Sequence, residues 1–233
     1  MGSDSPREAP VSEAEDSSRQ QQKDLQRDAF MAEVASWFEG KTFTTDWVTR
    51  KAMRWHRFLR GLRKEKADVL EVGTFEGRSA VFMLNYLPHA RITCVDFFKG
   101  ELDARFDTNL APYGDRVTKL KGSAAGHLDA LGQAQARYDL IYLDAGKRRD
   151  DALALSLLAW PLLKTSGIFI WDDYDWGLDR PPAERPHDGI ATFLKLHEAD
   201  YNLLWDKGQV FVQRVSPPDG GPGHSPHNPN LSY

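Results

Sequence analysis

The sequence predicts an α/β protein with a doubly wound, mostly parallel sheet of seven strands, an antiparallel hairpin strand at its C-terminal end, and helices preceding the sheet. From residue 67 onward, short apolar segments alternate with segments of helical periodicity, which is typical of a parallel sheet covered on both faces. The last two apolar segments are separated only by Lys207 and Gly208, so they can pair only as an antiparallel hairpin.

Each expected element follows from its local pattern. Apolar residues at helical spacing between Leu25 and Phe38 predict a first helix that ends at Gly40, and Thr45 or Asp46 can cap a second helix reaching about residue 63. The later helices are expected over 77–87, 123–131, 149–163 and 188–199. The strands are expected over 67–73, 92–98, 116–122, 138–145, 167–173, 201–206 and 209–215.

The domain organisation follows from composition. Residues 1–24 are polar and residues 216–233 are rich in Pro, Gly and Asn, so both ends are predicted to be disordered. Residues 25–66 are expected to form N-terminal helices that belong to the same domain as the sheet, which covers residues 67–215. The second helix carries many Arg and Lys residues, which are interpreted as a solvated face, although such a face could also attract an anionic substrate or RNA.

Composition also limits the class of protein. The chain of 233 residues has 41% hydrophobic residues, a net charge of −4 and a single cysteine, Cys94. The charge argues mildly against a general nucleic-acid-binding protein, and a lone cysteine cannot form an internal disulfide. No apolar run approaches the ~20 residues of a membrane span, and the N-terminus shows no secretory signal. A cytoplasmic protein is expected.

A glycine-containing turn follows the first strand in "LEVGTFEGRS", residues 70–79. Gly73 and Gly77 allow a tight bend and a close approach of the backbone to a ligand. The turn lacks the residues of a phosphate-binding loop, and the carboxylate of Glu71 suits a cationic ligand better than a phosphate. Asp96 ends the next strand, where a carboxylate can bind both ribose hydroxyls, and Phe97 beside it could pack on a purine. Alternatively, Asp96 only caps the strand and Phe97 belongs to the core.

The stretch "VLEVGTFEGRSAVFML…ITCVDFF" resembles the first two motifs of class I S-adenosylmethionine-dependent methyltransferases, which have a Rossmann-like fold. The resemblance extends over about residues 68–215, and "KGSAAGHL" is similar to the next motif of that family. It implies S-adenosylmethionine as the cofactor. The residues implied to bind it are Glu71, Gly73, Thr74, Phe75, Gly77, Ser79, Asp96, Phe97, Ser123, Ala124 and Asp144.

Three carboxylates are expected to meet beyond the strand ends. Asp144 ends the fourth strand, and Asp172 and Asp173 follow the fifth. Such carboxylates need a cation, and Mg²⁺ prefers oxygen ligands. The spacing resembles that of catechol O-methyltransferases, and the surrounding sequence resembles bacterial sugar and macrolide-glycoside O-methyltransferases. The resemblance implies that Asp144, Asp172 and Asp173 bind Mg²⁺ or Mn²⁺. It also implies that Lys147 and Asp144 are the catalytic residues, with Lys147 as the general base.

These observations predict a methyltransferase that uses a divalent metal to methylate a hydroxyl of a small molecule, such as a natural product, a sugar or a catechol-like compound. Metal-independent methylation of nitrogen or oxygen is an alternative within the same class. A non-catalytic, cofactor-binding regulatory module is an alternative of another class, and RNA methylation rests only on the basic second helix. The expected partner is a hydroxylated small molecule, with a homodimer possible, no membrane association and no nucleic acid.

Overall fold

The computed structural model describes residues 13–215 and places a seven-stranded sheet at the centre of the protein. The strand order is β3-β2-β1-β4-β5-β7-β6. The first five strands pair in parallel, whereas β7 runs antiparallel to both β5 and β6. The predicted fold class is therefore confirmed, including the C-terminal hairpin. Of the two ends that were predicted to be disordered, residues 1–12 and 216–233 lie outside the described residues.

The strands agree with the expected apolar segments. They are β1 (Asp68–Val72), β2 (Arg91–Asp96), β3 (Val117–Lys121), β4 (Tyr138–Leu143), β5 (Leu163–Trp171), β6 (Tyr201–Trp205) and β7 (Val210–Arg214). The β5 strand begins earlier than predicted because the preceding helix ends at Ala159, just before Pro161. Proline cannot donate a backbone hydrogen bond within a helix, and a short 3-10 turn joins the two elements instead.

The helices are α1 (Glu13–Ser36), α2 (Ala52–Leu59), α3 (Arg78–Tyr86), α4 (Glu101–Leu110), α5 (Ala124–Gln133), α6 (Arg149–Ala159) and α7 (His187–Leu196). The second predicted helix is broken into α2 and two flanking 3-10 turns, at Thr49–Lys51 and Arg60–Lys64. The α4 helix was not predicted. Its sequence, ELDARFDTNL, buries only three side chains, and so few apolar positions give a weak helical pattern.

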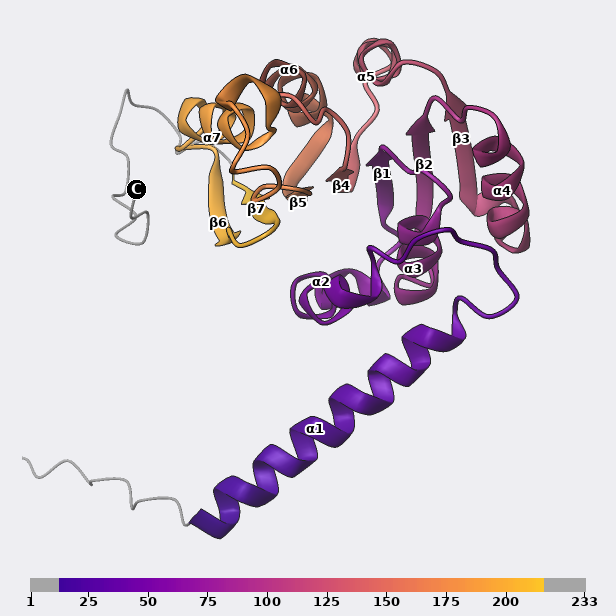
Figure 1. Cartoon of the computed structure of the whole chain (residues 1–233), viewed down its shortest axis with the longest axis vertical. Coiled ribbons are helices and arrows are strands. Elements are labelled where there is room, and N and C mark those ends of the chain that lie inside the picture. The colour runs from indigo at the N-terminus through magenta and orange to yellow at the C-terminus, as the bar shows by residue number, and fades with distance from the viewer. Residues whose placement is uncertain (1–12, 216–233) are drawn as a thin grey trace, which may run out of the picture.

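Helices cover both faces of the sheet, as Figure 1 shows. The end of α1 with α2, α3 and α4 packs on one face, and the core there includes Trp55, Phe82 and Phe106. The α5, α6 and α7 helices pack on the other face, where Trp171 and Phe193 are buried. The sheet is thus rigidly held, and its carboxyl edge is left to the loops that carry the predicted site.

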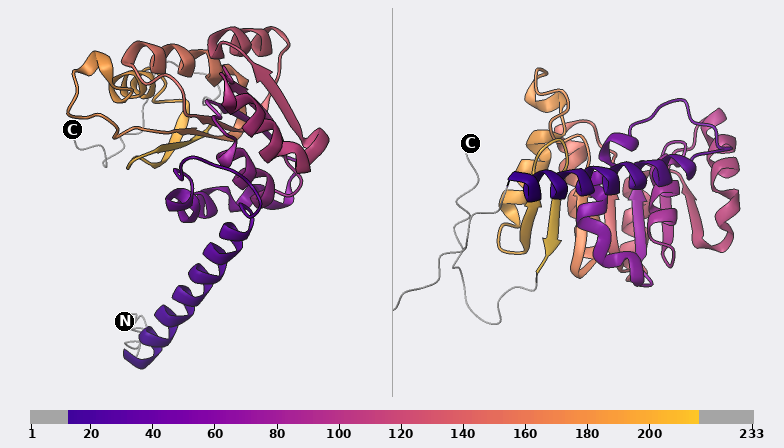
Figure 2. Two further views of the ribbon diagram at one scale, coloured as in Figure 1. Left: turned by 45° about the vertical axis from the view of Figure 1, so that its right-hand side comes forward. Right: turned by 90° about the horizontal axis from the view of Figure 1, so that it is seen from below.

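The α1 helix extends away from the sheet (Figures 1 and 2). It begins at Glu13, so residues 13–24 of the segment predicted to be disordered are helical. The prediction rested on the scarcity of apolar residues, and the side chains of residues 17–23 are exposed. Leu25 is 65% exposed, whereas Val34 near the other end of the helix is fully buried. Polar contacts along the helix, such as Gln20 with Asp24, support it locally.

None of the helices within residues 13–215 is both long enough and apolar enough to span a bilayer.

Candidate functional site

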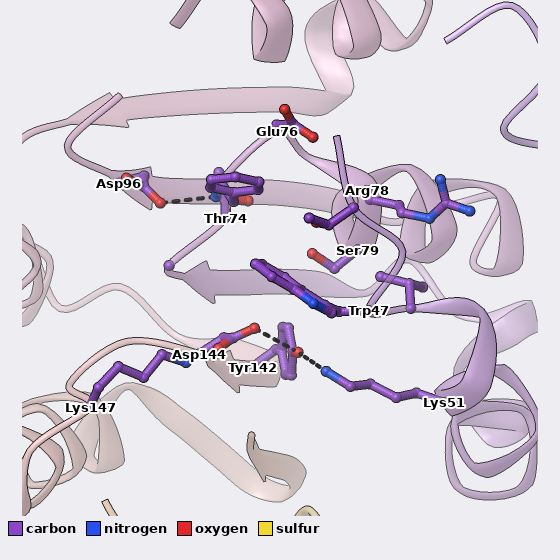
Figure 3. Close-up of a pocket in the computed structure, with 14 residues that line it drawn as sticks. Trp47, Lys51, Thr74, Glu76, Arg78, Ser79, Asp96, Tyr142, Asp144 and Lys147 are labelled. Carbon is purple, nitrogen blue, oxygen red and sulfur yellow. Dashed lines mark hydrogen bonds and ion pairs between the residues drawn. The ribbon is translucent and has the colours of Figure 1, made fainter. Parts of the chain in front are cut away.

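One pocket of about 190 Å³ opens at the carboxyl edge of the sheet, between the glycine turn and the ends of β2 and β4 (Figure 3). Its lining comes from four parts of the chain that are separated in sequence. The lining residues are Thr45, Trp47, Val48, Lys51, Gly73, Thr74, Phe75, Glu76, Arg78, Ser79, Asp96, Tyr142, Asp144 and Lys147.

The glycine turn between β1 and α3 forms one wall of this pocket. Gly73 has φ +89°, and a Cβ atom there would lie 2.7 Å from the carbonyl carbon of Asp144. Gly77 has φ +81° and faces Leu110 and Phe106 below the turn rather than the pocket. Only glycine combines this backbone conformation with such close packing, so both residues are required by the turn itself.

Glu71 lies beneath the turn and is fully buried. Its carboxylate accepts hydrogen bonds from the hydroxyls of Thr74 and Ser79. Burial raises the pKa of Glu71 to about 8, against the opposing effect of those two hydrogen bonds. Glu71 therefore supports the turn from within and does not line the pocket.

Asp96 shapes the turn and also lines the pocket. One carboxylate oxygen accepts the backbone N–H of Phe75 at 2.9 Å, and the other accepts that of Phe98 at 3.3 Å. Phe75 has φ +51°, which a residue other than glycine rarely adopts. The Asp96 bond thus helps to hold Phe75 in this conformation beside the pocket.

Besides Glu71 and Gly77, three more predicted cofactor residues do not line the pocket. Phe97 is 54% exposed with Lys99 over its ring, and Phe98 is the buried member of the pair. Ser123 and Ala124 begin α5, just beyond the end of β3. The lining of the pocket does not extend beyond Asp96 to these three residues. Their role at the adenine therefore stays a prediction.

The two adjacent aspartates after β5 face different partners. Asp172 is 6% exposed, and its carboxylate forms an ion pair with Lys51 and accepts the Tyr142 hydroxyl at 2.5 Å. Asp173 has φ +57° and forms an ion pair with Lys147. A left-handed conformation at a residue other than glycine is uncommon, and here it accompanies the separation of the two carboxylates.

Asp144 connects these two groups. One of its carboxylate oxygens lies 3.1 Å from the Tyr142 hydroxyl oxygen, and the other lies 2.5 Å from the Lys147 ammonium group. Burial, followed by the negative charge of Asp172, raises the pKa of Asp144 to about 7. In contrast, the Lys51 charge and hydrogen bonds outweigh burial and lower the pKa of Asp172 below its ordinary value.

Lys147 is held by Asp144 and Asp173. Burial disfavours its charge, but the two carboxylates outweigh that effect and raise its pKa above the ordinary lysine value. An amine must be neutral to accept a proton, and this one is kept protonated. The arrangement therefore does not support the predicted role of Lys147 as the catalytic base.

The predicted metal ligands are not arranged as a metal site. Across residues 13–215, no three His, Cys, Asp or Glu side chains are grouped so that they could hold a metal ion. Instead, Lys51 binds Asp172, and Lys147 bridges Asp144 and Asp173. The donor set as it stands does not fit a divalent ion, because lysine ammonium groups take the carboxylate oxygens that would coordinate it.

Residues 41–51, which we call the N-terminal strap, form the part of the site that the sequence analysis missed. The strap places Trp47 and Lys51 in the pocket, as Figure 3 shows. Trp47 is 51% exposed, and the centroid of its ring lies 5.6 Å from the centroid of the Phe75 ring. One signal was available: helical spacing puts Lys51 on the same stripe as the buried Val48 and Trp55, and a cation there requires a buried partner.

Two side chains of the glycine turn hold the strap. Glu76 accepts the Thr44 backbone N–H at 2.6 Å and the Thr44 hydroxyl at 2.9 Å. Arg78 donates to Asp46 at 2.8 Å. The strap is therefore attached to the same turn that forms the opposite wall of the pocket.

Residues 70–174 match a family model described as a methyltransferase domain. This segment is similar to a methyltransferase domain and makes up 105 of the 233 residues. The match spans the glycine turn, Asp96, Asp144 and the aspartate pair, so it includes the predicted site. The resemblance to class I methyltransferases is confirmed, and the prediction of an enzyme is confirmed at the level of this domain. No curated protein matched the sequence.

Solved structures of O-methyltransferases share the fold of this chain. MycE from the mycinamycin biosynthetic pathway, in complex with Mg, SAH and mycinamycin VI, matches with a TM-score of 0.61 and 17% identity over 82% of this chain and 56% of that chain. A putative caffeoyl-CoA O-methyltransferase from Staphylococcus aureus matches with a TM-score of 0.60 and 18% identity, over 84% of this chain and 99% of that chain. An O-methyltransferase from Bacillus cereus in complex with SAH matches with a TM-score of 0.61 and 18% identity, over 81% of this chain and 91% of that chain.

These identities establish the fold alone. The chain spans little more than half the length of MycE. The chemistry that this chain can carry out depends on the residues of its own pocket.

Proposed function

We propose that the protein transfers a methyl group from S-adenosylmethionine to a hydroxyl group of a small molecule. The observation that carries the proposal is that a single pocket joins the glycine turn and Asp96 to Tyr142, Asp144 and Lys51. The first set is suited to a nucleoside cofactor, and the second is suited to a hydroxyl group. A methyl donor and its acceptor must share one pocket for direct transfer.

The residues at the glycine turn fit S-adenosylmethionine. Gly73 presents backbone without a Cβ atom, and the Asp96 carboxylate lies at the end of β2, where a ribose can be bound. Asp144 supplies a further carboxyl group in the same pocket, and the lining contains no phosphate-binding loop. When bound, the cofactor supplies an electrophilic methyl group on a positively charged sulfur, and the sulfur leaves as the neutral thioether of S-adenosylhomocysteine.

The acceptor side supplies polar groups of both kinds. Asp144 can accept a hydrogen bond from the acceptor hydroxyl and can receive its proton as the oxygen gains the methyl group. Lys51 and Tyr142 lie beside it and can orient that oxygen. The exposed Trp47 indole offers a flat apolar face, which supports an acceptor with an aromatic or sugar ring.

The magnesium-assisted form of this reaction, which the sequence favoured, requires a change in the acceptor site. A divalent ion lowers the pKa of a bound hydroxyl, but it needs the oxygens that Lys51 and Lys147 now bind. The proposed methyl transfer does not depend on which cation occupies the acceptor site. A hydroxylated small molecule as partner, a homodimer and a cytoplasmic location also remain predictions from the sequence.

Calorimetry with S-adenosylhomocysteine tests the cofactor side. We expect binding to the wild type and a loss of about 1–3 kcal/mol in Asp96→Ala, because charged hydrogen bonds are removed. Asp96→Asn is the matched control, since its amide oxygen can still accept the Phe75 N–H, and we expect a smaller loss. No binding to the wild type would contradict the proposed function. Equal affinity in all three proteins would remove Asp96 from the site.

Mass spectrometry tests the transfer itself. The protein is incubated with a methyl-deuterated donor and a panel of hydroxylated aromatic and sugar compounds. We expect the labelled methyl group on an oxygen of one compound class. Label found only on nitrogen, on RNA or on protein would contradict O-methylation of a small molecule.

A further inference from the structure

Lys51 is a buried cation at the acceptor end of the pocket. Its side chain is 8% exposed, and its ammonium group pairs with the Asp172 carboxylate, whose side chain is 4% exposed. The Tyr142 hydroxyl lies 3.4 Å from the same ammonium group. Lysine is rarely buried unless it is paired, so this ion pair is a built feature of the site.

The charges of the cluster come close to balance without any added ion. Asp144, Asp172 and Asp173 contribute three carboxylates, and Lys51 and Lys147 contribute two ammonium groups, which leaves one negative charge when all are ionised. A divalent ion placed among these carboxylates would lie close to two positive charges. It would have to displace at least Lys51 from Asp172 before it gained a full set of ligands.

The backbone of Lys51 is fixed, so the ammonium group is delivered by a rigid element. Lys51 ends the 3-10 turn that leads into α2, and its N–H donates to the Val48 carbonyl at 2.8 Å. The neighbouring Ala52 and Trp55 are fully buried. Displacement of the ammonium group would therefore leave Lys51 buried without its partner or require α2 to move, and either change is costly.

We propose that the Lys51 ammonium group is the resident cation of the acceptor site and makes a divalent metal ion unnecessary there. The proposal rests on the proposed methyl transfer to a hydroxyl. Lys51 lines the pocket while it is paired with Asp172, so it can donate a hydrogen bond to the acceptor oxygen and stabilise negative charge that develops on it. The carboxylates of this chain are thus already paired with lysine ammonium groups of the same chain.

Binding of Mn²⁺, followed by electron paramagnetic resonance on the full chain, tests the proposal independently of activity. We expect the wild type to leave the signal of free Mn²⁺ unchanged. Lys51→Met removes the charge but keeps the length of the side chain, and it is expected to bind Mn²⁺ and to melt at a higher temperature when Mn²⁺ is added. Lys64→Met, which removes an exposed lysine just beyond α2, is the matched control and should behave as the wild type.

Lys51→Arg provides a second variant in case Lys51→Met does not fold. It keeps the positive charge and should not bind Mn²⁺. With an acceptor identified, EDTA should leave the wild-type rate unchanged, and Lys51→Met should lower it by about 10²-fold, as the loss of one donor to a developing oxyanion does.

Stoichiometric Mn²⁺ binding by the wild type that Asp172→Asn abolishes would overturn the proposal. That outcome would leave methyl transfer itself intact. Conversely, a wild type that does not bind S-adenosylhomocysteine would contradict the proposed function, whatever the result with Mn²⁺.

Discussion

Glu76 offers the sharpest test of how the glycine turn holds the acceptor side of the pocket. Its side chain is 1% exposed, and its carboxylate accepts three hydrogen bonds: two from Thr44 and one from Arg105 at 2.5 Å. The bonds to Thr44 attach the N-terminal strap. Substitution of Glu76 should therefore loosen the segment that carries Trp47 and Lys51.

The magnitude follows from these contacts. Removal of one partner of a buried ion pair costs about 3–5 kcal/mol. Arg105 is 23% exposed and keeps a second partner in Glu101 at 3.0 Å, so the lower end of that range applies to Glu76→Ala. Glu76→Gln keeps an oxygen that can accept from Thr44 but loses the charge, and we expect about 1–2 kcal/mol.

Urea denaturation followed by tryptophan fluorescence gives the free energy of unfolding. A loss of about 3 kcal/mol corresponds to a fall in melting temperature of roughly 6–12 °C for a domain of this size. The Gln variant should fall between Ala and the wild type. The loosened strap should also weaken the protection of residues 41–51 against hydrogen exchange.

The pH dependence gives an independent readout. Burial of Glu76 works to raise its pKa, but the hydrogen bonds from Thr44 and Arg105 outweigh it and lower the pKa from the ordinary 4.5. The stabilisation is therefore fully present above about pH 4.5 and is lost as the pH falls through the lower pKa of the folded state. The difference in the free energy of unfolding between the wild type and Glu76→Gln should therefore become smaller as the pH falls through that range. A Glu76→Ala protein as stable as the wild type, or a gap that does not change with pH, would refute the reasoning.

Two further predictions concern glycines. Gly73→Ala should weaken S-adenosylhomocysteine binding at least about tenfold and lower the free energy of unfolding by about 1–3 kcal/mol. The reason is that its Cβ would meet the Asp144 carbonyl group while the backbone keeps a positive φ. Calorimetry showing wild-type affinity would contradict this. Gly189→Ala in α7 should lower the free energy of unfolding by about 1–3 kcal/mol, because its Cβ would press on the Arg149 carbonyl group of α6. Gly132→Ala, which has open space in α5, should be neutral or stabilising by up to about 1 kcal/mol. Thermal denaturation that shows equal effects at the two sites would be the contrary result.

The sequence by itself determined the sheet and the cofactor side of the site. The segments that became β1, β2, β4 and β5 are apolar runs bounded by glycine or aspartate, and such local patterns need no knowledge of distant residues. Gly73 and Asp96 were found for the same reason, since each lies directly after a strand whose carboxyl end forms the edge of the sheet. The α4 helix was missed because its local pattern is weak.

Only the tertiary structure decided which cation faces the aspartates. Lys51 and Asp172 are 121 positions apart, and nothing local to Asp172 indicates a lysine from the N-terminal strap. The same holds for Thr44 and Glu76, which are 32 positions apart. The sequence showed that the carboxylates of Asp144, Asp172 and Asp173 must be neutralised, because like charges in a cleft repel each other. It could not show that two lysines would do so, because charge balance fixes the sign of the partner and only packing fixes its identity.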